Sequence, residues 1–134
     1  MSAEIAPNRP SKALIWTGRV LSTLPVLMLL MSAGMKFARP PEVVEGMSKL
    51  GYSVDLAVPL GIVELACTII YVVPQTAVLG AILLTGYLGG ATATHVRVGD
   101  PWFGPVVFGV VLWLGLYLRD ARLRALLPLR GKPS

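Results

Sequence analysis

The residue best suited to chemistry in this sequence is Glu64, which stands inside the apolar run PLGIVELACTIIYVV. A charged side chain at the centre of a bilayer costs roughly 2.5–3.5 kcal/mol to insert, so such residues usually face a bundle interior and have a polar partner. Glu64 lies eight residues beyond Leu56, or about 12 Å along a helix. We therefore expect Glu64 near the middle of a membrane, as a candidate acid or base.

The expected partners of Glu64 lie in the segment TGYLGGATATHVRVGDPW. Helical side chains tilt toward the N-terminus of their own helix, which leans Glu64 and His95 toward each other across an antiparallel hairpin, with Thr92 between them. Glu64 and His95 are thus the candidate catalytic pair. Candidate ligand-binding residues around them are Lys36, Gly61, Tyr87, Thr92 and Arg97. Taken alone, His95 fits better as an interface histidine bonded to a backbone carbonyl, and Arg97 fits a surface pair with Asp100.

These residues require membrane helices to position them. The chain is 54% hydrophobic and only 14% charged, against about a quarter charged in an ordinary soluble domain. Four stretches approach the roughly 20 apolar residues that cross a bilayer, and they cover residues 13–36, 56–73, 76–96 and 103–118. The prediction is a single all-α transmembrane domain over residues 1–134, an integral membrane four-helix bundle.

The loops and charges give this bundle a predicted orientation. Of the twelve Lys and Arg residues, eight lie outside or at the start of the outermost helices, and cytoplasmic flanks carry such an excess. Both termini are therefore expected in the cytoplasm of a multi-pass inner-membrane protein. In the first outer loop, Pro40-Pro41 precedes apolar residues at helical spacing up to Leu50, which predicts a short amphipathic helix ending at Gly51.

Several classes of function fit poorly. The single cysteine, Cys67, has no CxxC partner, and one histidine with one carboxylate is too few ligands for a structural zinc site. The basic net charge of +5 is explained by orientation and anionic lipid, with no need for nucleic acid. No cofactor motif is present. A small-residue row at Gly86, Gly90 and Thr94 would allow close helix packing or a homo-oligomer.

Three motifs in order resemble the DoxX-like membrane proteins. They are SAGMKF at the end of the first helix, GIVELAC in the second and GGATATHVRVGDPWF at the end of the third. On this resemblance Lys36, Gly61, Glu64 and His95 correspond to the family's motif residues. The resemblance implies four helices and a membrane subunit that works near quinone beside a redox protein partner.

Three functions stay open. The first is an accessory or ligand-binding subunit for membrane redox chemistry, with a quinone or lipid-like ligand near Glu64 and His95. The second is a small membrane enzyme that uses these two residues as acid and base on a lipophilic substrate. The third is a purely structural membrane subunit. Replacing Glu64 by Gln separates them in part, because a structural hydrogen bond would largely survive and proton transfer would not.

Overall fold

The computed structural model describes residues 11–130. Its four long helices are α1 (Lys12–Ala38), α3 (Ala57–Val72), α4 (Ala77–Val98) and α5 (Phe103–Arg119). Three helical segments, Lys12–Ala38, Val54–Val72 and Pro74–Val98, are long and apolar enough to cross a bilayer, and Phe103–Arg119 is a shorter apolar helix. The predicted fold class, an all-α helical membrane bundle, is confirmed, and the helices closely follow the expected ranges.

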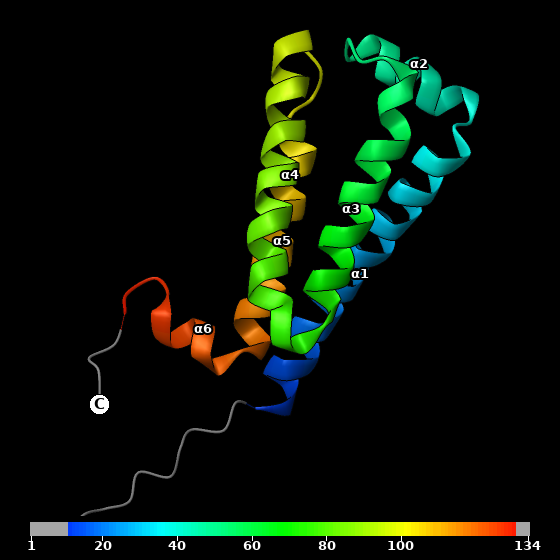
Figure 1. The fold of residues 1–134 in the computed structure, drawn as a ribbon. Helices are drawn as coiled ribbons and strands as arrows, with labels where there is room; N and C mark the ends of the chain where they lie inside the picture. Colours follow the sequence, from blue (N-terminus) through cyan, green and yellow to red (C-terminus); the bar gives the residue numbers. More distant parts are fainter. Residues whose placement is uncertain (1–10, 131–134) are drawn as a thin grey trace, which may run out of the picture.

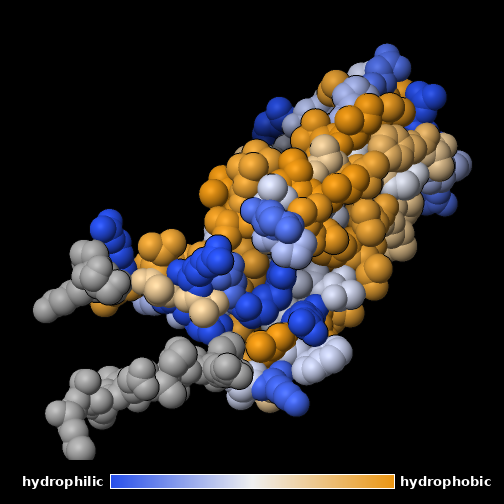
Figure 2. All heavy atoms as spheres, turned by 60° about the horizontal axis from the view of Figure 1, so that its bottom comes forward, coloured by the Kyte–Doolittle hydropathy of each residue, from blue (hydrophilic) through white to orange (hydrophobic). Residues whose placement is uncertain are grey.

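The four long helices form a ring in which each contacts two neighbours. Helix α1 packs against α3 and α5, and α4 packs against the same two helices from the opposite corner (Figure 1). The core between them contains Tyr71, Leu84, Leu112 and Leu116. On the face that Figure 2 shows, apolar residues cover the middle of the bundle and hydrophilic residues gather toward its two ends. Helices that are apolar on all sides are typical of membrane spans. The apolar outer surface of this bundle is therefore suited to contact with lipid.

The bundle is packed most closely at the end where residues 11 and 130 lie, here called the terminal end. A Cβ added to Gly80 would overlap backbone atoms of Tyr71, so α3 and α4 touch there through their main chains. A Cβ on Gly18 would come within 2.7 Å of the carbonyl oxygen of Gly115, which fixes α1 against α5. Only glycine permits such approaches, which are a recurrent means of joining membrane helices.

The opposite end, here called the α2 end, is more open. Figure 1 shows the α1/α3 pair and the α4/α5 pair diverging toward it. The short helix α2 (Pro41–Lys49) lies across this end and confirms the predicted loop helix. Proline stands at its first position and Gly51 follows with φ of 82°, the asymmetry expected at the two ends of a helix.

Three contacts from the end of α4 hold α2 and the turn that follows it. Arg97 Nη2 donates to the carbonyl oxygen of Leu50 at 2.9 Å, and the hydroxyls of Tyr52 and Thr94 lie 2.9 Å apart. Lys49 forms an ion pair with Asp100 at 3.1 Å. The alternative surface pair of Arg97 with Asp100 is not formed, because Lys49 pairs with the carboxylate and Arg97 donates to a backbone carbonyl.

The remaining elements are short. Single 3-10 turns, η1 (Val54–Leu56) and η2 (Pro74–Thr76), precede α3 and α4, and α6 (Ala121–Leu126) follows α5. The Asp120 carboxylate accepts from the backbone N–H groups of Arg122 and Leu123 and so caps α6. This helix lies at the terminal end (Figure 1). The basic residues Arg9 and Lys132, which the predicted orientation counts, lie outside the described part of the chain.

Candidate functional site

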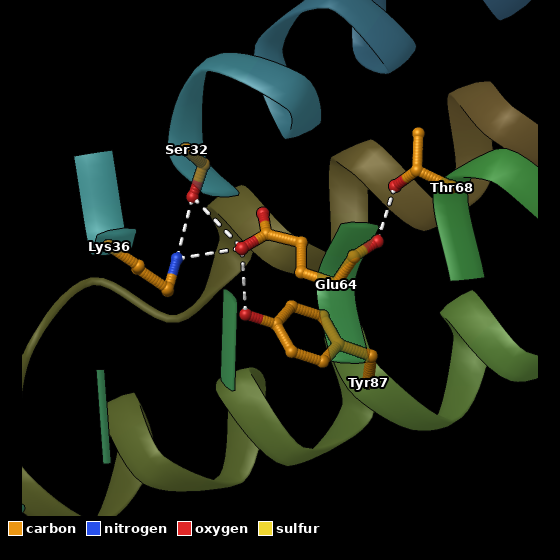
Figure 3. Close-up of polar contacts among 5 residues, drawn as sticks. All are labelled: Ser32, Lys36, Glu64, Thr68 and Tyr87. Carbon is orange, nitrogen blue, oxygen red and sulfur yellow. Dashed lines mark hydrogen bonds and ion pairs between the residues drawn. The ribbon is translucent and has the colours of Figure 1, made fainter. Parts of the chain in front are cut away.

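Glu64 is almost fully enclosed, at 1% exposure, and its carboxylate is held by side chains from two other helices. Its Oε2 atom accepts from Lys36 Nζ at 2.8 Å, from Tyr87 Oη at 3.1 Å and from Ser32 Oγ at 3.3 Å. Lys36 also donates to Ser32 at 2.7 Å. Figure 3 shows these groups converging on one carboxylate oxygen. We call Ser32, Lys36, Glu64 and Tyr87 the carboxylate cluster.

The register of the α3–α4 hairpin explains why Tyr87 reaches Glu64. The turn centres on Gln75 and Thr76, so positions equidistant from it lie level in an antiparallel pair. This register sets Tyr71 beside Gly80, which the close contact there confirms, and sets Glu64 beside Tyr87. His95 lies eight residues further along α4, or about 12 Å away at the rise of an α-helix.

His95 is accordingly not among the hydrogen-bond partners of Glu64. Its Nδ1 atom lies 2.7 Å from the carbonyl oxygen of Ala91, one turn earlier in the same helix. A nitrogen that contacts a carbonyl oxygen at this distance must carry the proton, which makes the other ring nitrogen an acceptor in neutral histidine. The expected contact between Glu64 and His95 is replaced by the interface histidine that the sequence left as its alternative.

The second carboxylate oxygen of Glu64 has a different environment. Oε1 accepts no hydrogen bond from residues 11–130, yet in the same range no fully buried side-chain oxygen or nitrogen lacks a partner. Oε1 therefore touches accessible space. Glu64 contributes to the wall of a cavity of about 500 Å³, which we call the α1–α5 cavity. In Figure 3 no dashed line reaches this second carboxylate oxygen.

The α1–α5 cavity is mostly apolar and lies at the α2 end of the bundle. Its wall includes the side of α2 with Val43, Met47 and Leu50, and a row of methionines on α1. Two of these methionines, Met28 and Met31, are also exposed on the outside of the bundle. A cavity of this size, apolar with a few converging polar groups, is typical of small-molecule sites.

A second cavity, of about 380 Å³, lies between α3 and α4, and we call it the α3–α4 cavity. His95 contributes to its wall, as do Gly86, Gly90 and Thr94. The two cavities share wall residues, chiefly Lys36, Tyr87 and Met47. A Cβ added to Gly86 or Gly90 would meet no atom within 4 Å, so among residues 11–130 these two glycines border a cavity and do not pack against another helix.

The other predicted site residues lie outside the cluster. Gly61 gives room to α1, since an added Cβ would lie 3.2 Å from Lys36 Cβ. Thr92 donates to the carbonyl oxygen of Leu88 within α4. Arg97 fastens the end of α2, as described above, and lines neither cavity.

Ser32 is the cluster residue that the sequence analysis missed. It stands one helical turn before Lys36, and residues four apart share a face of a helix. This spacing is the signal that could have found it. In the described part of the chain, no three His, Cys, Asp or Glu side chains come together to hold a metal ion. What the cluster offers instead is an acceptor at Glu64 Oε1 beside the N–H donors of Lys36.

Comparison with known proteins gives one match. Residues 20–117 match the model of the DoxX-like family. No curated protein and no solved structure matches the chain. The matched range includes the whole carboxylate cluster and His95, and it covers well over half of the sequence. The chain is a helical membrane protein that belongs to the DoxX-like family.

Proposed function

We propose that this protein binds a lipid-soluble molecule with a polar ring or head, of the quinone class, in the α1–α5 cavity. The observation that carries the proposal is Glu64, which lines an apolar cavity of about 500 Å³ while three donors hold only one of its two carboxylate oxygens, Oε2. A carboxylate oxygen beside an apolar cavity gains from a hydrogen-bond donor, because little water surrounds it there. A bound ligand with a hydroxyl group would supply one.

The polar groups of the site match both forms of a quinone. Lys36 Nζ uses two of its three N–H donors on Ser32 and Glu64, and the third can reach a carbonyl oxygen of the oxidised ring. Glu64 Oε1 can accept from the hydroxyl group of the reduced ring. A site with an acceptor and a donor side by side therefore holds the ring in either state.

The surroundings suit a lipid-soluble ligand. Met28 and Met31 line the α1–α5 cavity and face the outside of the bundle, so the cavity borders the hydrocarbon region. Methionine side chains are flexible and adapt to varied shapes. A ligand that carries an apolar tail would leave the tail between these residues and lipid, with its head at the carboxylate cluster.

The proposed role also includes an orientation in the membrane and a partner protein. The excess of Lys and Arg at the terminal end supports a cytoplasmic position for both termini, with the carboxylate cluster in the opposite half of the inner membrane. As an accessory subunit, the protein would exchange the ligand with a redox partner protein. Cross-linking in the native membrane, followed by identification of the cross-linked protein, tests that partnership.

A structural role is the second candidate, and the cluster itself favours it. Ser32 and Lys36 come from α1, Glu64 from α3 and Tyr87 from α4, so the hydrogen bonds join three helices. If stability were the whole purpose, the cavity beside the cluster would be of no use. Filling that cavity without touching the cluster distinguishes the two functions.

The experiment measures bound quinone by native mass spectrometry of the full-length protein in mild detergent, with a decyl-chain benzoquinone and its reduced form as probes. In Gly104→Leu, a side chain enters the α1–α5 cavity from a glycine whose Cβ would meet nothing within 4 Å. The matched control is Gly89→Leu, which is equally free of contacts and lines neither cavity. Glu64→Gln is compared with Glu45→Gln, which changes an exposed carboxylate on α2.

We expect Gly104→Leu and Glu64→Gln to lose about tenfold or more in affinity, the usual effect of a lost charge-assisted hydrogen bond or a blocked pocket. Both controls should bind as the wild type does. Binding that is equal in all five proteins, or absent from the wild type, would contradict the ligand site and leave the structural function. Equal binding in wild type and Gly104→Leu but not in Glu64→Gln would contradict the α1–α5 cavity as the place where the ligand binds.

A further inference from the structure

A second polar hollow lies at the terminal end, remote from the carboxylate cluster. It has a volume of about 290 Å³ and is formed by α1, α3 and α5. Its polar wall consists of Arg19, Ser22, Thr23, Tyr71 and Arg119. We call it the arginine pocket. Neither the family match nor the proposed function assigns it a role.

Arg119 is fixed in position by the pocket. Its Nε atom donates to Ser22 Oγ at 3.1 Å, and its guanidinium carbon lies 5.6 Å from the centre of the Tyr71 ring. Tyr71 is in turn held by its hydroxyl group, which donates to the carbonyl oxygen of Leu112 at 2.8 Å and lies 3.0 Å from Ser22 Oγ. The guanidinium is thus pre-organised, with both terminal nitrogens free of partners among residues 11–130.

Arg19 adds a second positive charge. Its guanidinium carbon lies 5.3 Å from the ring centre of Trp16 on the same helix. The described residues contain two ion pairs, Lys36 with Glu64 and Lys49 with Asp100, and neither arginine takes part. Asp120, which follows Arg119 in the sequence, accepts a hydrogen bond from a backbone N–H group of α6. Two arginines thus line one pocket without an acidic partner in the described range. Their positive charges favour the binding of an anion there.

The shape and position of the pocket indicate which anion. An arginine fork matches the geometry of phosphate oxygens and binds them through paired hydrogen bonds. Toward the α2 end, the pocket continues into an apolar surface, where Val72 lines it and Ile69, one turn away, is exposed. A phosphate ion would need only the arginines, whereas a phospholipid would use the arginines and this surface together.

We propose that the arginine pocket binds the phosphate group of an anionic phospholipid, with an acyl chain along the exposed face of α3. The orientation predicted from Lys and Arg places this end at the cytoplasmic leaflet, whose anionic lipids attract basic residues near the surface. The lipid would join α1, α3 and α5 at the end where the helices already pack most closely. This site is independent of the proposed quinone site.

The test is native mass spectrometry of the full-length protein titrated with phosphatidylglycerol or with phosphatidylethanolamine of the same acyl chains. The informative variant is Arg19→Gln, because the exposed Arg19 side chain lies over Trp16 and makes no hydrogen bond or ion pair with residues 11–130. Arg122→Gln removes the same charge from an exposed position on α6 outside the pocket and serves as the control. Arg119→Lys keeps the charge but loses the fork that Ser22 and Tyr71 hold in place.

We expect the wild type and Arg122→Gln to prefer phosphatidylglycerol, and Arg19→Gln and Arg119→Lys to bind it about tenfold more weakly, since charge-assisted hydrogen bonds are lost. Equal binding of the two lipids, or equal loss in Arg19→Gln and Arg122→Gln, would overturn the proposal. A third arm adds inorganic phosphate in excess. Displacement of the lipid by phosphate alone would show that the pocket recognises the free anion and overturn the assignment to a lipid.

Discussion

The ion pair of Lys36 and Glu64 allows an unequal response to two substitutions. The pair is 2.8 Å long, and the Lys36 side chain is 21% exposed while that of Glu64 is only 2% exposed. Lys36→Met leaves a carboxylate with no counter-charge in an enclosed position. Glu64→Gln leaves an ammonium group that can turn toward the head-group region, as lysine near a helix end commonly does. The first change should therefore cost more stability than the second.

The magnitude follows from the distance. At 2.8 Å and an effective dielectric constant of about 20, the Coulomb attraction is about 6 kcal/mol, and desolvation of the two charges offsets several kcal/mol of it. Removing one member of such a pair leaves the other uncompensated. We expect Lys36→Met to lower the free energy of unfolding by about 3 kcal/mol and Glu64→Gln by about 1 kcal/mol.

The assay is unfolding by sodium dodecyl sulfate in mixed micelles, followed by far-ultraviolet circular dichroism. The control is Lys49→Met, which breaks the surface pair with Asp100, where the lysine side chain is 70% exposed. Its cost should stay below about 1 kcal/mol. The double variant Lys36→Met/Glu64→Met removes both charges and should regain about half of the loss caused by Lys36→Met. The reasoning is refuted if Lys36→Met costs no more than Lys49→Met, or if Glu64→Gln costs more than Lys36→Met.

Four further substitutions test the packing and the α2 contacts. Gly80→Ala places a methyl group against the backbone of Tyr71 and should lower the free energy of unfolding by about 2 kcal/mol or more in the same titration. Gly86→Ala meets no atom within 4 Å and should leave it unchanged or raise it by up to about 1 kcal/mol. Equal effects of the two substitutions would contradict the assigned α3–α4 contact. Tyr71→Phe removes the buried hydroxyl bond and should cost about 1–2 kcal/mol, and no loss would show that this bond is not formed. Arg97→Gln releases the end of α2 and should speed amide hydrogen exchange around residues 47–52 without affecting the core of α4, so unchanged exchange would exclude Arg97 as a tether.

The helices could be predicted because each long apolar run has only one stable solution in a bilayer, and the prolines and glycines at their ends fix the limits. The loop helix α2 could be predicted from a different signal, the helical spacing of its apolar residues between Pro41 and Gly51. Helix α6 could not. It has six residues and too little apolar surface to give a period, and the signal at its start is a single capping residue, Asp120.

The partners of Glu64 were only partly predictable. The tilt of the side chains led to the prediction of His95 as a partner. Tilt shifts the reach of a side chain by about one helical turn, whereas His95 lies about two turns beyond the α4 residue that is level with Glu64. The turn at Pro74–Thr76 fixes that register and sets Tyr87, a predicted ligand-binding residue, level with Glu64. The contact with Lys36 was suggested by its place at the end of the first helix, and Ser32 follows from Lys36. The cavities themselves depend on how the two helix pairs diverge, which no local pattern records.

The close contacts at the terminal end fix the helices there, so any change in helix angle displaces the α2 end most. Gly18 with Gly115 and Gly80 with Tyr71 hold the helices at one end, and the α1–α5 cavity lies near the other. Over the length of a 20-residue helix, about 30 Å, a rotation of two degrees about the closed end displaces the open end by about 1 Å. Small packing changes at the glycine contacts would therefore be amplified at the α1–α5 cavity, and substitutions at these glycines would alter its width.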